Sequence, residues 1–155
     1  MKSIVHGLII FFITSTQGFA MSLFDFAKVC LFSEVNGQVL LNGKPIKNVQ
    51  ILRKTSFQNK KSTEVTNTNE IGEFHFDAKH EKSIAKFLPV EVVISQEIEA
   101  IYNSKHYELW KTTKRDYEEN SELIGKAVNL VCDLSHKSEY QTIGEHVIKS
   151  ICSLE

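Results

Sequence analysis

The sequence predicts an all-β fold: an antiparallel two-sheet β-sandwich of about seven to eight strands, preceded by an N-terminal signal helix. Two observations support this prediction. The turn dipeptide Asn42-Gly43 lies between apolar runs, and the longest alternating run of the chain follows Pro89. Asn-Gly is a strong hairpin signal because a type I′ turn requires positive φ at both central residues. Strict alternation of apolar and polar residues is typical of a strand with one buried face.

The first predicted hairpin covers residues 35–53, with Pro45 just after the turn, where a missing N–H is tolerated. A second pair is marked by Gly72, which leads into a short strand whose residues Phe74 and Phe76 share one face. The polar stretch between these pairs, residues 56–69, is expected to form a loop and one edge strand.

Five further segments complete the expected sandwich. We favour a brief helical or irregular segment over residues 21–32, although a lead-in strand is the alternative. The other expectations are a solvated connection over 77–87, a long connection over 114–125 with Tyr117 packed inwards, a buried strand ending at Cys132, and a strand rather than a helix within 140–152.

These patterns carry a family resemblance. The pattern G-x-V-x-x-N-G-x-P-x-x-x-V at residues 37–49, followed by T-x-x-x-G-x-F-x-F at residues 68–76, resembles the opening half of carboxypeptidase regulatory-like and transthyretin-like β-sandwich domains. The runs from Tyr107 to Leu134 resemble a group of small exported bacterial envelope proteins of this class. The resemblance implies a binding or spacer module. In the regulatory-like family the catalytic zinc belongs to a separate domain, so the resemblance implies no enzymatic activity, no metal and no cofactor.

Composition fits one domain without a nucleic-acid partner. The chain has 155 residues, 42% of them apolar, with 18 basic and 19 acidic side chains. This size and apolar content suit a single core, which we place in residues 21–155. A surface that binds phosphates usually shows a clustered basic excess, and near-neutral charge argues against one.

The N-terminus has the three parts of a secretory signal peptide. Lys2 precedes an apolar run over residues 8–13, and Gly18-Phe19-Ala20 places small residues before a cleavage point. We expect cleavage after Ala20 and a periplasmic or secreted protein with no stable membrane span, because a bilayer requires ~20 apolar residues. The alternative is an uncleaved amphipathic or membrane-anchoring helix.

The three cysteines fit an oxidising compartment, in which two of them are expected to pair. We favour a disulfide between Cys132 and Cys152, while Cys30 with Cys132 is a rival that spacing leaves open. A catalytic thiol would need a histidine partner and a lowered pKa. No motif in the sequence specifies a histidine partner for a cysteine, so no catalytic residue is predicted.

The long alternating run predicts a hairpin with one polar face. Over residues 90–102 every second position, Gln96 excepted, is apolar or aromatic, whereas Glu97 and Glu99 point to the opposite face. After a turn at 103–104 the chain returns, so this face should bring the two glutamates close to His106 and Glu108. Two carboxylates at i and i+2 raise an acid–base hypothesis. Alternating glutamate is also a solubility pattern, which we favour.

Aromatic side chains give the functional hypothesis. Trp110, Tyr107 and Tyr102 would cluster at one end of the long hairpin, and exposed Trp and Tyr are enriched in protein interfaces and sugar sites. The alternative is that Trp110 belongs to the core. We therefore expect a non-enzymatic module that binds a protein, in its most concrete form an immunity or inhibitor protein whose acidic face matches a toxin's basic cleft. The second hypothesis is a module that binds cell-wall glycan or another carbohydrate.

Overall fold

The computed structural model describes residues 27–154, and the predicted signal peptide lies outside them. In this part of the chain the protein is all-β, and no helix there is long and apolar enough to cross a membrane. The elements in chain order are β1 (Lys28–Phe32), β2 (Val35–Leu41), β3 (Lys44–Pro45), β4 (Gln50–Phe57), β5 (Lys60–Asn67), β6 (Glu73–Phe76), β7 (Lys79–Lys82), the 3-10 helix η1 (Ile84–Phe87), β8 (Ile94–Tyr102), β9 (Lys105–Lys114), the 3-10 helix η2 (Ser121–Leu123), β10 (Val128–Asp133), β11 (Glu139–Ile143), β12 (His146–Ser150) and β13 (Cys152–Leu154).

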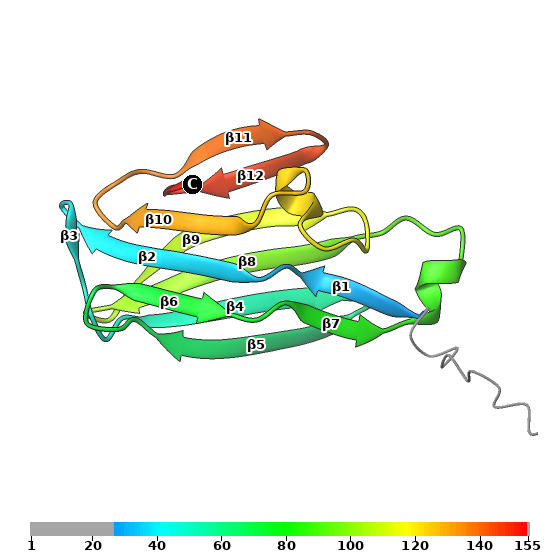
Figure 1. Cartoon of the computed structure of the whole chain (residues 1–155), viewed down its shortest axis with the longest axis horizontal. Coiled ribbons are helices and arrows are strands. Elements are labelled where there is room, and N and C mark those ends of the chain that lie inside the picture. Colours follow the sequence, from blue (N-terminus) through cyan, green and yellow to red (C-terminus); the bar gives the residue numbers. More distant parts are fainter. Residues whose placement is uncertain (1–26, 155) are drawn as a thin grey trace, which may run out of the picture.

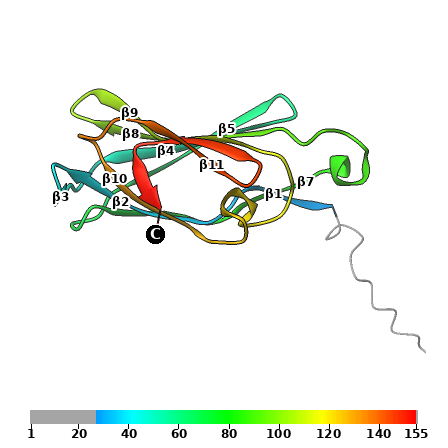
Figure 2. The same ribbon diagram turned by 90° about the horizontal axis from the view of Figure 1, so that it is seen from above.

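The strands form two layers that face each other across the core, consistent with a β-sandwich (Figures 1 and 2). One layer has the order β13-β10-β2-β3, with β6 also paired to β2, and the β1–β7 pair lies beyond its end. The other layer has the order β11-β12-β9-β8-β4-β5. The prediction of seven to eight strands is too low, because short breaks divide long runs: only two residues separate β1 from β2 and β6 from β7.

The Asn42-Gly43 turn forms as predicted, with φ of 51° and 75° at its two residues. The hairpin itself is shorter than expected, since β2 is followed by the two-residue β3 and the chain then crosses to the other layer. There β4 pairs with β5 and β8. The sheets are also not wholly antiparallel, because β2 runs parallel to β10.

Of the lead-in expected over residues 21–32, residues 21–26 lie outside the described part of the chain, and Lys28–Phe32 form a strand, the alternative, rather than the favoured helical or irregular segment. Residues Val29 to Phe32 are buried without a break, so both faces of β1 are covered and the usual alternation is missing. Val29 and Leu31 join Phe57 and Ile94 in a small core cluster. Tyr117 packs against this cluster, as predicted, with its ring centroid 6.0 Å from that of Phe57.

The connections between strands are also more regular than predicted. Residues 56–69 contain the end of β4 and β5, which confirms the predicted edge strand, and the solvated connection at 77–87 contains β7 and η1. The buried strand that ends near Cys132 is present as β10, and the segment 140–152 is strand, as expected. That segment forms the β11–β12 hairpin and the start of β13.

Charged side chains are buried between the layers at two places, and the first is Arg53. The Arg53 guanidinium lies 4.8 Å from the ring centroid of Phe76, donates to both carboxylate oxygens of Glu64 and donates to the Asp77 carbonyl at 2.6 Å. Such pairing offsets the cost of removing the cation from water.

The second place holds the ion pair of Lys114 and Glu122. Both side chains are fully buried, and Lys114 Nζ lies 3.4 Å from Glu122 Oε2. The carboxylate also accepts hydrogen bonds from Ser33 and from Gln96 Nε2. Burial raises the pKa of Glu122, but Lys114 and these hydrogen bonds outweigh it, so the pKa lies below its ordinary value.

Candidate functional site

The β8–β9 hairpin places Glu97 and Glu99 on the outer face that the alternation of the sequence predicts. In β8, Ile94, Ile98 and Ala100 are buried, so Glu97 and Glu99 point away from the core. The neighbouring strand β9 adds His106 to this outer face, and β4 adds Lys54 from the other side of β8. The structure thus brings together most of the residues proposed from the sequence.

A network of ion pairs covers this outer face, which we call the charged ladder. Each glutamate forms an ion pair with at least one lysine. Lys54 binds Glu97 and Glu99. Lys111 lies between Glu97 and Glu108, and Lys149 binds Glu108 at 2.6 Å. His106 Nδ1 lies 2.6 Å from Glu99. The expectation of an acidic face is therefore wrong, because lysines from β4, β9 and β12 neutralise the three glutamates.

The ion pairs keep these carboxylates ionised. Partial burial raises the pKa of Glu99, but the hydrogen bonds from Lys54 and His106 outweigh it, and the net pKa is lowered. The pKa of Glu108 is lowered in the same way by Lys149 and Lys111. A general acid at neutral pH needs a raised carboxyl pKa. These directions favour the structural interpretation of the glutamates over acid–base chemistry.

Trp110 does not belong to this face. Its side chain is fully buried, because the pairing of β8 with β9 shifts so that Trp110 lies opposite Ile98 while Glu108 lies opposite Glu99. Leu109 is the extra residue of this bulge, and both it and Trp110 point into the core. The interpretation of Trp110 as an exposed anchor is wrong, and the alternative that it belongs to the core is confirmed. Tyr102 and Tyr107 are half-buried and pack against the same core.

The exposed aromatic residue beside the charged ladder is Tyr140 on β11, which sequence reasoning missed. Its side chain is 72% exposed, and Val147 on β12 is 56% exposed. The register pairs Tyr140 with Lys149 and Thr142 with Val147, so these side chains share the outer face of the sheet. Tyr140, Val147 and Lys149 line a shallow hollow together with Lys111. We call Tyr140, Val147, Lys149 and Lys111 the β11–β12 face.

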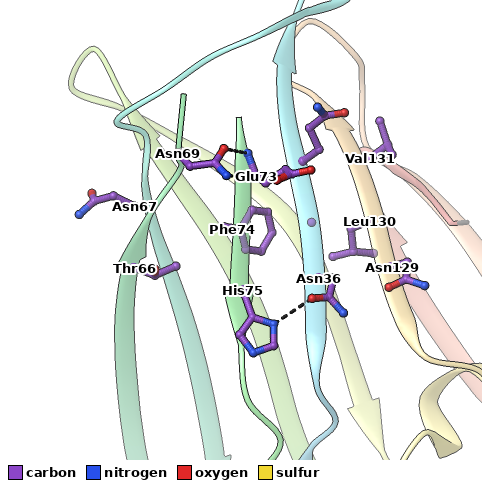
Figure 3. Close-up of a pocket in the computed structure, with 12 residues that line it drawn as sticks. Asn36, Thr66, Asn67, Asn69, Glu73, Phe74, His75, Asn129, Leu130 and Val131 are labelled. Atoms are coloured by element: carbon purple, nitrogen blue, oxygen red, sulfur yellow. Dashed lines mark hydrogen bonds between the residues drawn. The ribbon is translucent and has the colours of Figure 1, made fainter. Parts of the chain in front are cut away.

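A second hollow lies on the outer face of the opposite layer, over β6, β2 and β10 (Figure 3). Its lining is rich in amides and other polar groups, including Asn36, Gln38, Asn129 and His75. His75 Nδ1 lies 2.8 Å from Asn36 Oδ1, so part of this polar set is already paired. The buried ring of Phe74 occupies the space where a side chain at Gly37 would lie, only 2.2 Å from an ideal Cβ.

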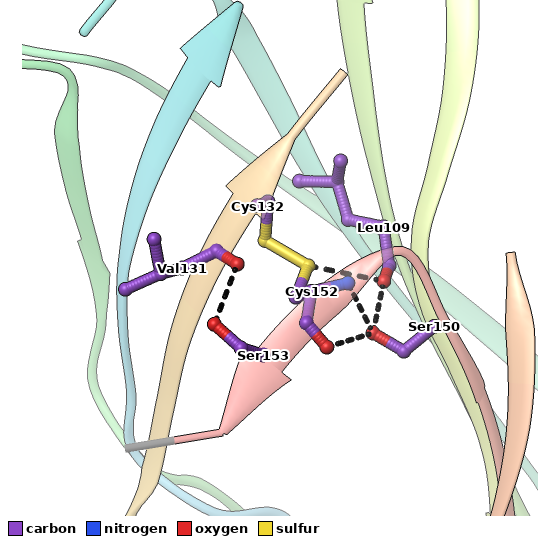
Figure 4. The surroundings of a disulfide bond; sticks show 6 residues. All are labelled: Leu109, Val131, Cys132, Ser150, Cys152 and Ser153. Carbon is purple, nitrogen blue, oxygen red and sulfur yellow. Dashed lines mark hydrogen bonds between the residues drawn. A yellow bond between two sulfur atoms is a disulfide. The ribbon is translucent and has the colours of Figure 1, made fainter. Parts of the chain in front are cut away.

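The disulfide joins Cys132 and Cys152, as favoured from the sequence (Figure 4). The two residues are paired neighbours on β10 and β13, with Cα atoms 4.0 Å apart. Cys30 is free and buried. Burial raises the pKa of its thiol, which disfavours the reactive thiolate.

Asp133 holds the Asn42-Gly43 turn in place. Its carboxylate accepts the backbone N–H of Asn42 at 3.1 Å and that of Gly43 at 2.6 Å, and it also accepts from Ser135. These hydrogen bonds, with that of the Ser135 side chain the strongest, hold the pKa of Asp133 well below its ordinary value. This pairing ties the predicted turn to β10.

Within residues 27–154, no three His, Cys, Asp or Glu side chains are grouped so that they could hold a metal ion. The fold and the exposed faces define an all-β protein with two facing layers and a charged, partly aromatic outer surface. Residues 35–137 match the family described as "Domain of unknown function (DUF6795)", and the chain belongs to this family. No curated protein matches the chain.

Proposed function

We propose that this protein is a non-enzymatic binding module that contacts a partner protein through the β11–β12 face. The observation that carries the proposal is Tyr140, a large aromatic side chain that is 72% exposed beside Val147. Tyrosine supplies a large, rigid contact area and a hydroxyl, and it is enriched among residues that dominate binding energy. Lys111 and Lys149 next to it provide a polar rim.

The charged ladder gives this face a defined shape. Because Lys149 and Lys111 are bound to Glu108, their side chains are held in place before a partner arrives. A preorganised surface loses less conformational entropy on binding. The partner surface that fits such a face has an apolar pocket for Tyr140 and carboxylates that reach the two lysines. A toxin neutralised by an immunity or inhibitor protein is the most concrete form of such a partner.

The cellular setting is part of the same proposal. A signal peptide over residues 1–20 would deliver the chain to the periplasm or the medium, where the Cys132–Cys152 disulfide is stable. The turn and strand patterns at residues 37–49 and 68–76 support a carboxypeptidase regulatory-like or transthyretin-like form of the sandwich.

The second candidate function is binding of cell-wall glycan or another carbohydrate, and the amide-rich hollow favours it. Asn36, Gln38 and Asn129 present donors and acceptors on one outer face of the β2 layer. Such groups match the hydroxyls of a sugar. No exposed Phe, Tyr or Trp lies among the residues that line this hollow, so the stacking on such rings that is common in sugar sites would not contribute there.

Affinity capture from the native envelope fraction tests both functions. Wild type, Tyr140→Ala and Thr63→Ala serve as baits, with Thr63 on the same outer face at the opposite edge of the sheet. A protein retained by wild type and Thr63→Ala but lost with Tyr140→Ala supports the protein-binding module. Binding to purified peptidoglycan that is lost in Asn129→Ala supports the glycan function instead. Turnover of an ester or peptide substrate without either kind of binding would contradict both.

A further inference from the structure

Strand β11 forms an open edge of the larger sheet. It is the terminal strand in the order β11-β12-β9-β8-β4-β5, so within residues 27–154 it pairs with β12 alone. Four of its five residues are exposed, and Glu139 is its one charged residue. Open edges readily pair with another strand, and natural proteins usually protect them with charges.

The other edge of the same sheet is protected. Strand β5 carries Lys60, Lys61 and Glu64. Glu64 binds Arg53 and Lys79, and Lys60 binds Glu81 on β7, so ion pairs connect this edge to the opposite layer. The two edges therefore differ, and β11 is the one that is available for pairing.

The hairpin geometry determines which backbone groups of β11 point outwards. Only two residues separate Ile143 from His146, so these two form a hydrogen-bonded pair at the turn. In an antiparallel ladder, hydrogen-bonded and non-hydrogen-bonded pairs alternate. The N–H and C=O groups of Tyr140 and Thr142 consequently point away from β12, towards the open edge.

This edge is complementary to itself. If two copies of β11 pair antiparallel about Gln141, Tyr140 of each copy lies opposite Thr142 of the other, and these residues can exchange four backbone hydrogen bonds. The same register brings Lys137, which precedes β11, to the end of the pair where Glu145 lies in the β11–β12 turn of the other copy, and both of these residues are exposed. Glu139 lies opposite Ile143, so no like charges face each other.

We propose that the protein forms a two-fold symmetric dimer in which β11 pairs with β11 of a second copy, joining two six-stranded sheets edge to edge. The pairing uses backbone groups, so the side chains of Tyr140 and Val147 stay on the outer face of the sheet. The dimer would then present two β11–β12 faces side by side. A second copy is favoured as the occupant because this self-pairing register brings opposite charges, Lys137 and Glu145, near each other at both ends of the paired strands.

Disulfide trapping tests the register. Gln141→Cys places two thiols opposite each other at a non-hydrogen-bonded pair, where Cα separations suit a disulfide. Under mild oxidation this variant should become a covalent dimer, while Thr63→Cys, on the protected edge of the same sheet, should not. Equal cross-linking at both positions would overturn the proposal.

Sedimentation analysis of the purified protein over a range of concentrations tests the backbone pairing. Thr142→Pro removes one outward N–H and leaves the bonds to β12 intact, so it should be monomeric, whereas Thr142→Val should dimerise as wild type does. If Thr142→Pro fails to fold, Lys137→Glu should weaken the dimer and Lys137→Glu with Glu145→Lys should restore it. A monomeric wild type at every concentration would overturn the proposal. A dimer that Lys137→Glu does not weaken would also overturn it.

Discussion

At the scale of single residues, charged groups inside the sandwich are held by specific partners. Lys114 and Glu122 come from the end of β9 and from η2, and Ser33 and Gln96 complete the hydrogen bonds of the carboxylate. Removing one member of a buried pair leaves an uncompensated charge, which costs much more than losing an exposed pair. These residues should therefore dominate the response of stability to mutation and pH.

We expect Lys114→Met to lower the free energy of unfolding by about 3–5 kcal/mol at pH 7, measured by urea denaturation. Without the lysine, burial should raise the pKa of Glu122, so the deficit should shrink as pH falls and this carboxyl becomes protonated. The control Lys47→Met breaks the exposed pair with Glu70 and should cost less than about 1 kcal/mol. Equal effects of the two substitutions would contradict this account.

Asp133→Asn should lower the free energy of unfolding by about 1–3 kcal/mol at pH 7, because the ionised carboxylate accepts the turn N–H groups. The pKa of Asp133 in the folded protein lies below its ordinary value of 3.8. The stabilisation is therefore complete above that pH and is lost as pH falls below it.

The measurement is urea denaturation of both proteins between pH 2 and 7. The difference in free energy of unfolding between wild type and Asp133→Asn should be constant at higher pH and should narrow below about pH 4. Asp77→Asn, which alters a fully exposed carboxylate, is the matched control and should change stability by less than about 0.5 kcal/mol. A gap that does not depend on pH would show that the charge of Asp133 is unimportant.

At the scale of elements, pattern and turn chemistry predict individual strands well. The Asn42-Gly43 turn and the alternation of β8 follow from local sequence, whereas spacing alone left Cys30 as a rival partner for Cys132. Local sequence does not show which strands lie next to each other in the sheet. Lys54 reaches Glu97 from 43 residues earlier in the chain, and no period-two pattern contains that information.

The bulge in β9 shows a second limit of sequence patterns. A one-residue insertion reverses which side chains face the core, so simple alternation places Trp110 beside Glu108, on the wrong face. Tyr140 was missed for a related reason: its exposure follows from the position of β11 at the edge of the sheet, and the sequence does not show which strand is outermost.

The contrast between Trp110 and Tyr140 gives a direct test of the bulge. Trp110→Ala should lower the free energy of unfolding by about 3–5 kcal/mol, because it empties a fully buried site. Tyr140→Ala should change it by less than about 0.5 kcal/mol, since that side chain is mostly exposed. Urea denaturation of both variants measures the difference. Similar small effects would place the tryptophan outside the core.

The disulfide stabilises the contact between β10 and β13. Cys132 and Cys152 are separated by 20 residues, and closing a loop of this length is worth about 3 kcal/mol. Dithiothreitol should therefore lower the urea midpoint of wild type but leave that of Cys132→Ser with Cys152→Ser unchanged. If the reductant has no effect on wild type, the bridge is absent or does not stabilise the fold.

At the scale of the whole molecule, the two layers present different outer faces. One carries the charged ladder and the exposed pair Tyr140 and Val147, and the other carries the amide-rich hollow. The lowered pKa values of Glu99 and Glu108 and the burial of the Cys30 thiol support the proposed binding function. The β11–β12 face is therefore the part of the molecule on which the proposed function depends.

Site-specific photo-crosslinking in the native cell tests that function most directly. A photoreactive amino acid is placed at Val147, on the β11–β12 face, or at Thr63, on the same outer face at the other edge of the sheet. The proposed function predicts a covalent adduct with a different protein at position 147 and none at position 63. Adducts at position 63 alone, or no protein adduct at either position, would contradict it.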